Sequence, residues 1–159
     1  MFTEEVTIAE AETLSSLLGV SLISCEVLST HSDRATYFAA ARACSTHLFL
    51  DPDTGLFLGR LGHRREPAYL YADELAAIAA RPKALTLVFD QSVPRGGERA
   101  SLERKLSILA AEGLPGIGYV SHACFILVGR EKGLVEDALR VLLRQSHLPK
   151  ERFVGLLSI

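Results

Sequence analysis

Three aspartates follow the two most strand-like runs of the sequence, and they are its first candidates for chemistry. Asp51 and Asp53 come directly after the apolar run at residues 46–50. Asp90 ends the apolar run at residues 84–90. If these runs are parallel neighbours in a sheet, the three carboxylates converge at one edge. Carboxylate oxygens are the hard ligands that Mg²⁺ or Mn²⁺ prefers, so the sequence predicts a metal site there. Such a metal polarises a phosphoryl oxygen or activates a water.

A histidine and two arginines complete this candidate site. His122, in YVSHACF, is the expected general acid or base. Arg64 and Arg65 lie in the glycine-containing stretch 59–67 and are expected to bind a phosphate group. The plainer alternatives are a hydrogen-bonded strand histidine and a solvated charged loop. The predicted catalytic residues are therefore Asp51, Asp53, Asp90 and His122, and the first three are also the predicted metal ligands.

The stretch that carries Asp51 has a second interpretation as a simple turn. Asp-Pro-Asp-Thr-Gly is favourable turn chemistry, because Pro52 fits the second turn position and Gly55 tolerates a positive φ. The tripeptide LFL stands on both sides, which suits a symmetrical hairpin. The two interpretations differ in strand direction. In the hairpin, residues 56–58 pair back onto residues 47–50. The main role of the aspartates is then to form the turn, and they are candidates for catalysis only second.

The elements that must position these residues alternate between helix and strand. Helices are expected at residues 3–18, 33–44, 73–81, 98–112 and 134–145. Strands are expected at 20–29, 46–50, 84–90 and 152–159, while 116–129 is too long for one strand and predicts two, or one broken near Ser121 and His122. The run at 84–90 is nearly all apolar, which is typical of a central strand covered on both faces. This order implies crossover connections between parallel strands. The expected fold is a single α/β domain over residues 1–159, a three-layer Rossmann-like sandwich whose mainly parallel sheet has an antiparallel edge at 116–129.

Composition narrows the classes of partner. Apolar residues make up 48% of the chain and charged residues 23%, as in ordinary globular domains. The net charge of −2 argues against a broad nucleic-acid-binding surface, although a local basic patch stays open.

No apolar run approaches the length of a membrane span, and the N-terminus is acidic where a signal peptide would be basic. We therefore expect no membrane partner and a cytoplasmic location. The three isolated cysteines have no CxxC spacing, which speaks against a disulfide framework or a zinc site.

The segment LDPDTG resembles a motif of Rossmann-fold methyltransferases. Amino-methylating members carry D/N-P-P-Y/F after their fourth strand, and the order of the elements that follow here resembles the C-terminal half of that fold. Asp51 and Pro52 match the motif, whereas Asp53 and Thr54 replace its second proline and its aromatic residue. FLDPDTGL is also similar to an F-x-D-P-D-[NT]-G motif of uncharacterised bacterial and phage-type proteins, over residues 46 to about 130. That likeness implies no established activity.

Three hypotheses of function follow. The first is an enzyme that acts on nucleic acid or another phosphate-bearing substrate, such as a small molecule, through the carboxylate cluster with Mg²⁺ or Mn²⁺ as cofactor. The second is a non-catalytic module that binds a partner protein or self-associates as a homo-oligomer. The third is a degenerate methyltransferase-like domain, in which binding of S-adenosylmethionine is the open question.

Overall fold

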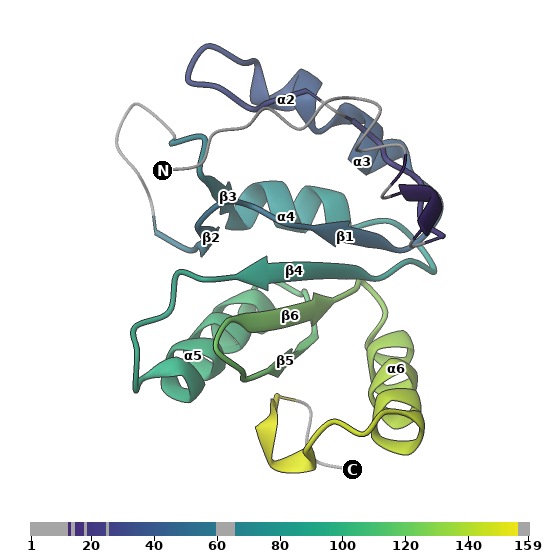
Figure 1. The fold of residues 1–159 in the computed structure, drawn as a ribbon, viewed down its shortest axis with the longest axis vertical. Coiled ribbons are helices and arrows are strands. Elements are labelled where there is room, and N and C mark those ends of the chain that lie inside the picture. The colour runs from purple at the N-terminus through teal and green to yellow at the C-terminus, as the bar shows by residue number, and fades with distance from the viewer. Residues whose placement is uncertain (1–12, 14, 18, 25, 60–65, 156–159) are drawn as a thin grey trace.

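The structure is a computed structural model of residues 1–159, in which the described residues are 13, 15–17, 19–24, 26–59 and 66–155. Figure 1 shows the helices α2 to α6 arranged around a central sheet. The helices are α2 (Arg34–Tyr37), α3 (Ala39–Ala43), α4 (Ala72–Ala79), α5 (Glu98–Ala111) and α6 (Lys132–Gln145). A short 3₁₀ helix, η1 (Lys150–Arg152), follows α6. The helix expected at residues 3–18 falls largely outside the described residues.

The central sheet has five strands in the order β1-β4-β6-β5-β7. They are β1 (Leu48–Leu50), β4 (Thr86–Asp90), β6 (Cys124–Val128), β5 (Gly116–Tyr119) and β7 (Phe153–Val154). Only β1 and β4 pair in parallel, and the other three pairs are antiparallel. A separate two-stranded parallel sheet joins β2 (Gly55–Phe57) to β3 (Tyr69–Tyr71). The architecture is therefore mixed α/β with a largely antiparallel main sheet.

The expectation of a mainly parallel sheet is wrong, and the reason lies in one short turn. The connections β1-α4-β4 and β4-α5-β5 do join strands that run in the same direction, as crossovers require. However, β5 and β6 are linked only by residues 120–123, so they form a hairpin and must be antiparallel. Strand β6 then inserts between β4 and β5. The predicted antiparallel edge thus lies inside the sheet, and the predicted three-layer Rossmann-like arrangement is not confirmed.

Two other expected strands differ from the structure. No strand is assigned among the described residues of the segment 20–29, whose apolar side chains Val20, Leu22, Ile23 and Val27 are exposed. High β propensity produces a strand only when the segment meets a partner edge and a face to cover. At the C-terminus, β7 has only two residues before Gly155, which adopts a positive φ of 80°. Residues 156–159 lie outside the described part of the chain.

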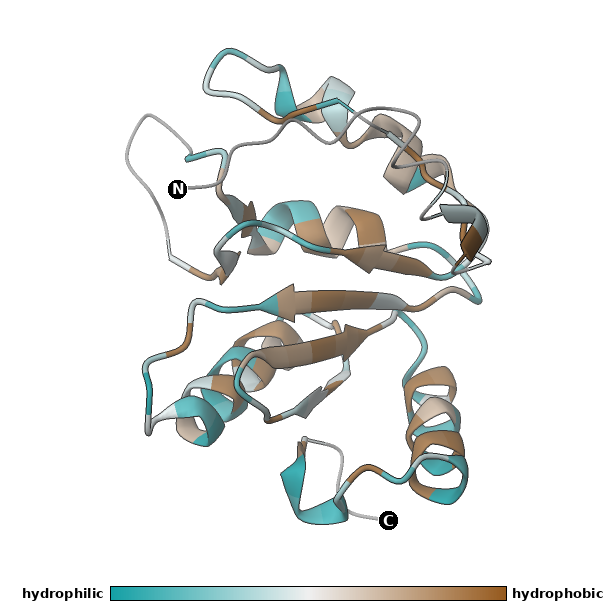
Figure 2. Ribbon diagram, in the orientation of Figure 1, coloured by the Kyte–Doolittle hydropathy of each residue, from teal (hydrophilic) through white to brown (hydrophobic). Residues whose placement is uncertain are grey.

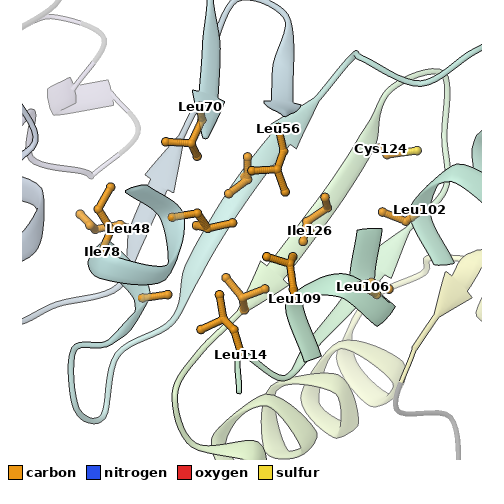
Figure 3. Packing of buried hydrophobic residues seen from close by; sticks show 14 of the residues in the cluster. Leu48, Leu56, Leu70, Ile78, Leu102, Leu106, Leu109, Leu114, Cys124 and Ile126 are labelled. Atoms are coloured by element: carbon orange, nitrogen blue, oxygen red, sulfur yellow. The ribbon is translucent and has the colours of Figure 1, made fainter. Parts of the chain in front are cut away.

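The main core lies between one face of the sheet and the helices α4 and α5. In β4 and β6 the side chains alternate between buried and half-buried, and the buried set includes Val88 and Ile126. Leu75 and Ile78 from α4 and Leu102 from α5 belong to the same core. The labelled side chains of the two helices and the sheet point toward one another in Figure 3. This layer fixes the position of β4, at whose end Asp90 stands.

A second, smaller cluster places α6 on the opposite face. Val135 and Leu139 of α6 are fully buried against Leu85, Ile117 and Phe153. Leu85 and Ile117 belong to the opposite face, because side chains alternate along a strand. The sheet thus carries helices on both faces, but α6 covers only the part near β5 and β7.

Candidate functional site

The direction of the strands decides between the two interpretations of the stretch around Asp51. Strand β1 runs parallel to β4, with Leu48 opposite Thr86 and Leu50 opposite Val88. Leu56 pairs with Leu70 of β3 rather than back onto β1. The hairpin interpretation is therefore wrong. The acidic stretch follows a strand end and leads into the second sheet, and the predicted parallel pairing of the two apolar runs is confirmed.

Asp51 and Asp53 stand at this strand end, and both are exposed. Partial burial of the Asp51 carboxyl group and, secondly, the negative charge of Asp53 raise the pKa of Asp51 above its usual value. The charge of Asp53 also contributes to the raised pKa of Tyr37, after burial and the charge of Glu26. The effect on Asp51 indicates that the Asp53 carboxylate is close enough to disfavour the ionised form of Asp51.

Asp90 has a different environment, because its carboxylate is fully buried and held by a lysine. Lys105, from the apolar side of α5, donates to Asp90 Oδ2 at 2.5 Å, and its side chain is only 10% exposed. Its ammonium also donates to Ser92 Oγ at 2.7 Å and to the Leu56 carbonyl at 2.9 Å. Three acceptors thus use the three N–H bonds of the ammonium group.

The second oxygen of Asp90 is equally occupied. Asp90 Oδ1 accepts from the Ser92 hydroxyl at 2.6 Å, the Ser92 N–H at 3.1 Å and the Leu56 N–H at 3.2 Å. We call Asp90, Lys105, Ser92 and the backbone of Leu56 the buried pin. The charges and hydrogen-bond donors of the buried pin are paired with one another. We therefore interpret the pin as a structural contact that joins β2, β4 and α5.

Gly55 makes the approach of β2 to the pin possible. Its φ is 130°, a conformation that residues with a side chain rarely adopt. A Cβ atom added at Gly55 would lie 2.1 Å from Asp90 Oδ1 and 3.0 Å from the Gln91 backbone nitrogen. The glycine is therefore required both by the backbone conformation and by the close contact with the Asp90 carboxylate.

The three-carboxylate metal cluster does not fit this geometry. Within residues 13–59 and 66–155, apart from the few undescribed positions, no group of three or more His, Cys, Asp or Glu side chains is arranged to hold a metal ion. Both oxygens of the Asp90 carboxylate accept hydrogen bonds from neighbours inside the buried pin. Whether Asp51 and Asp53 alone take part in cation binding or catalysis stays a prediction.

His122 lies in the 120–123 turn, at the same end of the sheet as Asp90. The first residue of β6, Cys124, pairs with Asp90, and this pairing places the turn beside the end of β4. His122 is exposed, and a Coulombic interaction with His122 is one of the lesser causes that lower the pKa of Glu98, after hydrogen bonds from the Glu98 and Gly96 backbone. Arg64 and Arg65 lie outside the described residues. The sheet end therefore gathers Asp51, Asp53, Asp90 and His122, but not as one contact group.

Sequence reasoning missed Lys105, Ser92 and Gly55 as members of the buried pin or its close neighbours. A signal was present for Lys105, which stands three residues after Leu102 and four before Leu109, on the apolar face of the predicted helix. A lysine on such a face requires a buried partner, and Asp90 ends the most apolar strand of the chain. Nothing in the local sequence indicated the contact of Gly55 with Asp90.

Comparison with known proteins adds no family to these observations. The chain matches no protein-family model, and neither a curated protein nor a solved structure matches it. In the described part of the chain, none of the helices is both long and apolar enough to cross a membrane.

Proposed function

We propose that this protein is an enzyme that acts on nucleic acid or another phosphate-bearing substrate at the carboxyl ends of β1 and β4. One observation carries the proposal: the parallel pairing of β1 with β4 brings Asp51 and Asp53 to the end of the sheet where Asp90 and His122 also stand. In sheets with parallel crossovers, ligands bind outside the carboxyl ends of the strands.

The proposed cation site has two carboxylates rather than three. Mg²⁺ keeps several waters and is commonly bound by one or two carboxylates together with substrate phosphates. Asp51 and Asp53 fit this pattern, because the charge of Asp53 helps to raise the pKa of Asp51 and a cation would relieve that repulsion. When bound, Mg²⁺ or Mn²⁺ would supply charge stabilisation to a phosphoryl oxygen.

The other predicted residues take distinct roles in this proposal. His122 is exposed at the same end of the sheet and serves as general acid or base. Arg64 and Arg65 bind the phosphate group. Asp90 is a positioning residue, since the buried pin holds the start of β2 against the end of β4.

Calorimetric titration with Mg²⁺ and with Mn²⁺ tests the cation site. We expect binding by the wild type, and loss of that binding in Asp51→Asn and in Asp53→Asn. Asp137→Asn is the matched control, because Asp137 is an exposed carboxylate on α6 that pairs with Arg140. Absence of cation binding, or equal loss in the Asp137 variant, removes the metal-dependent version of the proposal.

A turnover assay tests the reaction itself. Purified protein with Mg²⁺ or Mn²⁺ is incubated with single-stranded DNA, RNA and a simple phosphate ester, and released phosphate or cleaved strands are measured. We expect turnover of one of these that falls in His122→Ala and in Arg64→Ala. Activity that persists in both variants rules out their proposed roles.

The methyltransferase resemblance stays a separate prediction, tested by calorimetric titration with S-adenosylmethionine.

A further inference from the structure

Within the part of the chain that the structure describes, one face of the main sheet is only partly covered over β1, β4 and the start of β6. The side chains of Thr86, Val88 and Asp90 are buried toward α4 and α5, whereas Leu87 and Phe89 on the opposite face are only half-buried. The sequence of β4 predicted cover on both faces, and on this face the cover is partial. Helix α6 packs around Leu85, Ile117 and Phe153, further along the sheet.

One exposed and three half-buried apolar side chains adjoin one another on this face. Phe49 of β1 is 57% exposed and lies beside Leu87 in the register of the two strands. Phe89 lies beside Phe125, with ring centroids 5.2 Å apart. We call these four residues the open face. Figure 2 shows apolar colouring along β1, β4 and β6 with no helix in front of β1 or β4. Contiguous exposed apolar surfaces commonly mark interaction sites.

Two charged or polar residues flank the open face on β1. His47 precedes β1 and Asp51 follows it, each two residues from Phe49. If the alternation of the strand continues through these two positions, both side chains lie on the same side of the sheet as Phe49. Both are exposed. A base on one side of an apolar centre and an acid on the other is a self-complementary pattern, because a twofold axis brings each base to the other copy's acid.

The hydrogen bonding of His47 agrees with this pattern. Its Nδ1 accepts from the Leu85 N–H at 3.0 Å, so in the neutral ring the proton is on Nε2. Nε2–H is then the donor available to a carboxylate outside the chain. The contact with Leu85 also fixes the ring beside the start of β4, at the rim of the open face.

We propose that the open face binds a second copy of this chain around a twofold axis, with His47 of each copy donating to Asp51 of the other. The open face consists of four apolar side chains. The surface that they can bury is smaller than the ~800 Å² per partner of a typical stable interface. The dimer is therefore a reversible one that dissociates on dilution. The proposal does not depend on the proposed enzymatic function.

Sedimentation velocity over a wide range of protein concentration tests the dimer, in buffer with chelator so that cation binding to Asp51 does not enter. We expect a reversible monomer–dimer equilibrium for the wild type and at least a ~10-fold higher dissociation constant for Phe49→Asp. Val141→Asp is the matched control, because Val141 is 49% exposed on α6 away from the open face. A monomer at all concentrations, or equal weakening by Val141→Asp, overturns the proposal.

A charge exchange tests the contact across the axis. His47→Asp alone places acid against acid, and Asp51→His alone places base against base, so each variant is expected to be monomeric. An equimolar mixture restores both acid–base contacts in a heterodimer, and we expect it to sediment as a dimer. Far-UV circular dichroism verifies that both variants are folded. A folded mixture that stays monomeric overturns the His47–Asp51 pairing.

Discussion

Lys105 donates to the Asp90 carboxylate across 2.5 Å in the interior of the protein, where Asp90 is fully buried and Lys105 is almost so. Taking two charges out of water is costly, and their attraction offsets that cost only when the remaining hydrogen bonds are made. Here they are made, by Ser92 and by both backbone groups of Leu56. The ion pair therefore acts as a junction between distant segments of the chain.

Removing one partner of this pair should destabilise the protein strongly. Lys105→Met leaves the Asp90 carboxylate buried without its cation, and we expect a loss of about 3–5 kcal/mol in the free energy of unfolding. The double variant Lys105→Met/Asp90→Asn should recover part of the loss, because the charge is removed with its partner. Lys132→Met serves as the control, since Lys132 forms an exposed pair with Glu136 and should contribute no more than about 1 kcal/mol. Urea unfolding measures all three, and equal effects of Lys105→Met and Lys132→Met would contradict the prediction.

Gly55→Ala should be destabilising for two reasons that add. The positive φ of Gly55 is unfavourable for alanine, and the new methyl group would meet Asp90 Oδ1. We expect a loss of more than about 1 kcal/mol in thermal or urea unfolding. Gly133→Ala provides the opposite case, because Gly133 lies in α6 with nothing within 4 Å of the position that a Cβ atom would take, and alanine favours helix. That variant should be stabilised, by up to about 1 kcal/mol.

The raised pKa of Asp51 makes a prediction about pH. The folded state retains a proton that the unfolded chain has already lost, so stability falls as the pH rises from about the ordinary value of 3.8 through the raised pKa. Asp51→Asn removes this penalty, and we expect it to be more stable than the wild type at neutral pH. The difference should shrink as the pH is lowered through that window. Urea unfolding at a series of pH values measures it, and Asp137→Asn should leave the pH dependence unchanged.

Arg81 should control the local stability of β1. Its guanidinium is buried and donates to the carbonyls of Cys44 and Thr46 just before β1, and to Thr86 Oγ1 at the start of β4. Arg81→Met leaves these acceptors unsatisfied, which costs about 1–3 kcal/mol for each buried one. We expect faster amide hydrogen exchange at Leu48 than in the wild type. Arg144→Met, at an exposed position of α6, should not change that rate.

The cysteines should differ in their reaction with iodoacetamide. Hydrogen bonding with Thr46 lowers the pKa of Cys44, whereas burial raises the pKa of the Cys124 thiol. In a Cys25→Ser background, we expect alkylation of Cys44 well before Cys124, as followed by mass spectrometry. Thr46→Val should slow the reaction of Cys44. An unchanged rate in that variant would show that the hydroxyl does not stabilise the thiolate.

The sequence predicted the elements better than their arrangement. The runs that became β1, β4, α4, α5 and α6 had clear patterns, and the break near Ser121 and His122 is confirmed as the turn between β5 and β6. The position of β6 between β4 and β5 could not be predicted, because helix–strand alternation fixes the direction of crossovers but not where a hairpin inserts. For the site, the sequence indicated which carboxylates follow strands. It could not indicate that Asp90 forms an ion pair with Lys105, since that contact depends on how α5 packs on the sheet.

The buried pin has a consequence for the order in which the chain assembles. Its contacts join Lys105 to Leu56 across 49 positions and Leu56 to Asp90 across 34. By contrast, the hairpin of β5 and β6 closes over only the 120–123 turn, and α5 lies directly between β4 and β5 in sequence. Long-range contacts form late, because the entropy of closing their loops is lost before they stabilise anything. We therefore expect the C-terminal half to fold first as a nucleus, with docking of residues 54–57 completing the native state.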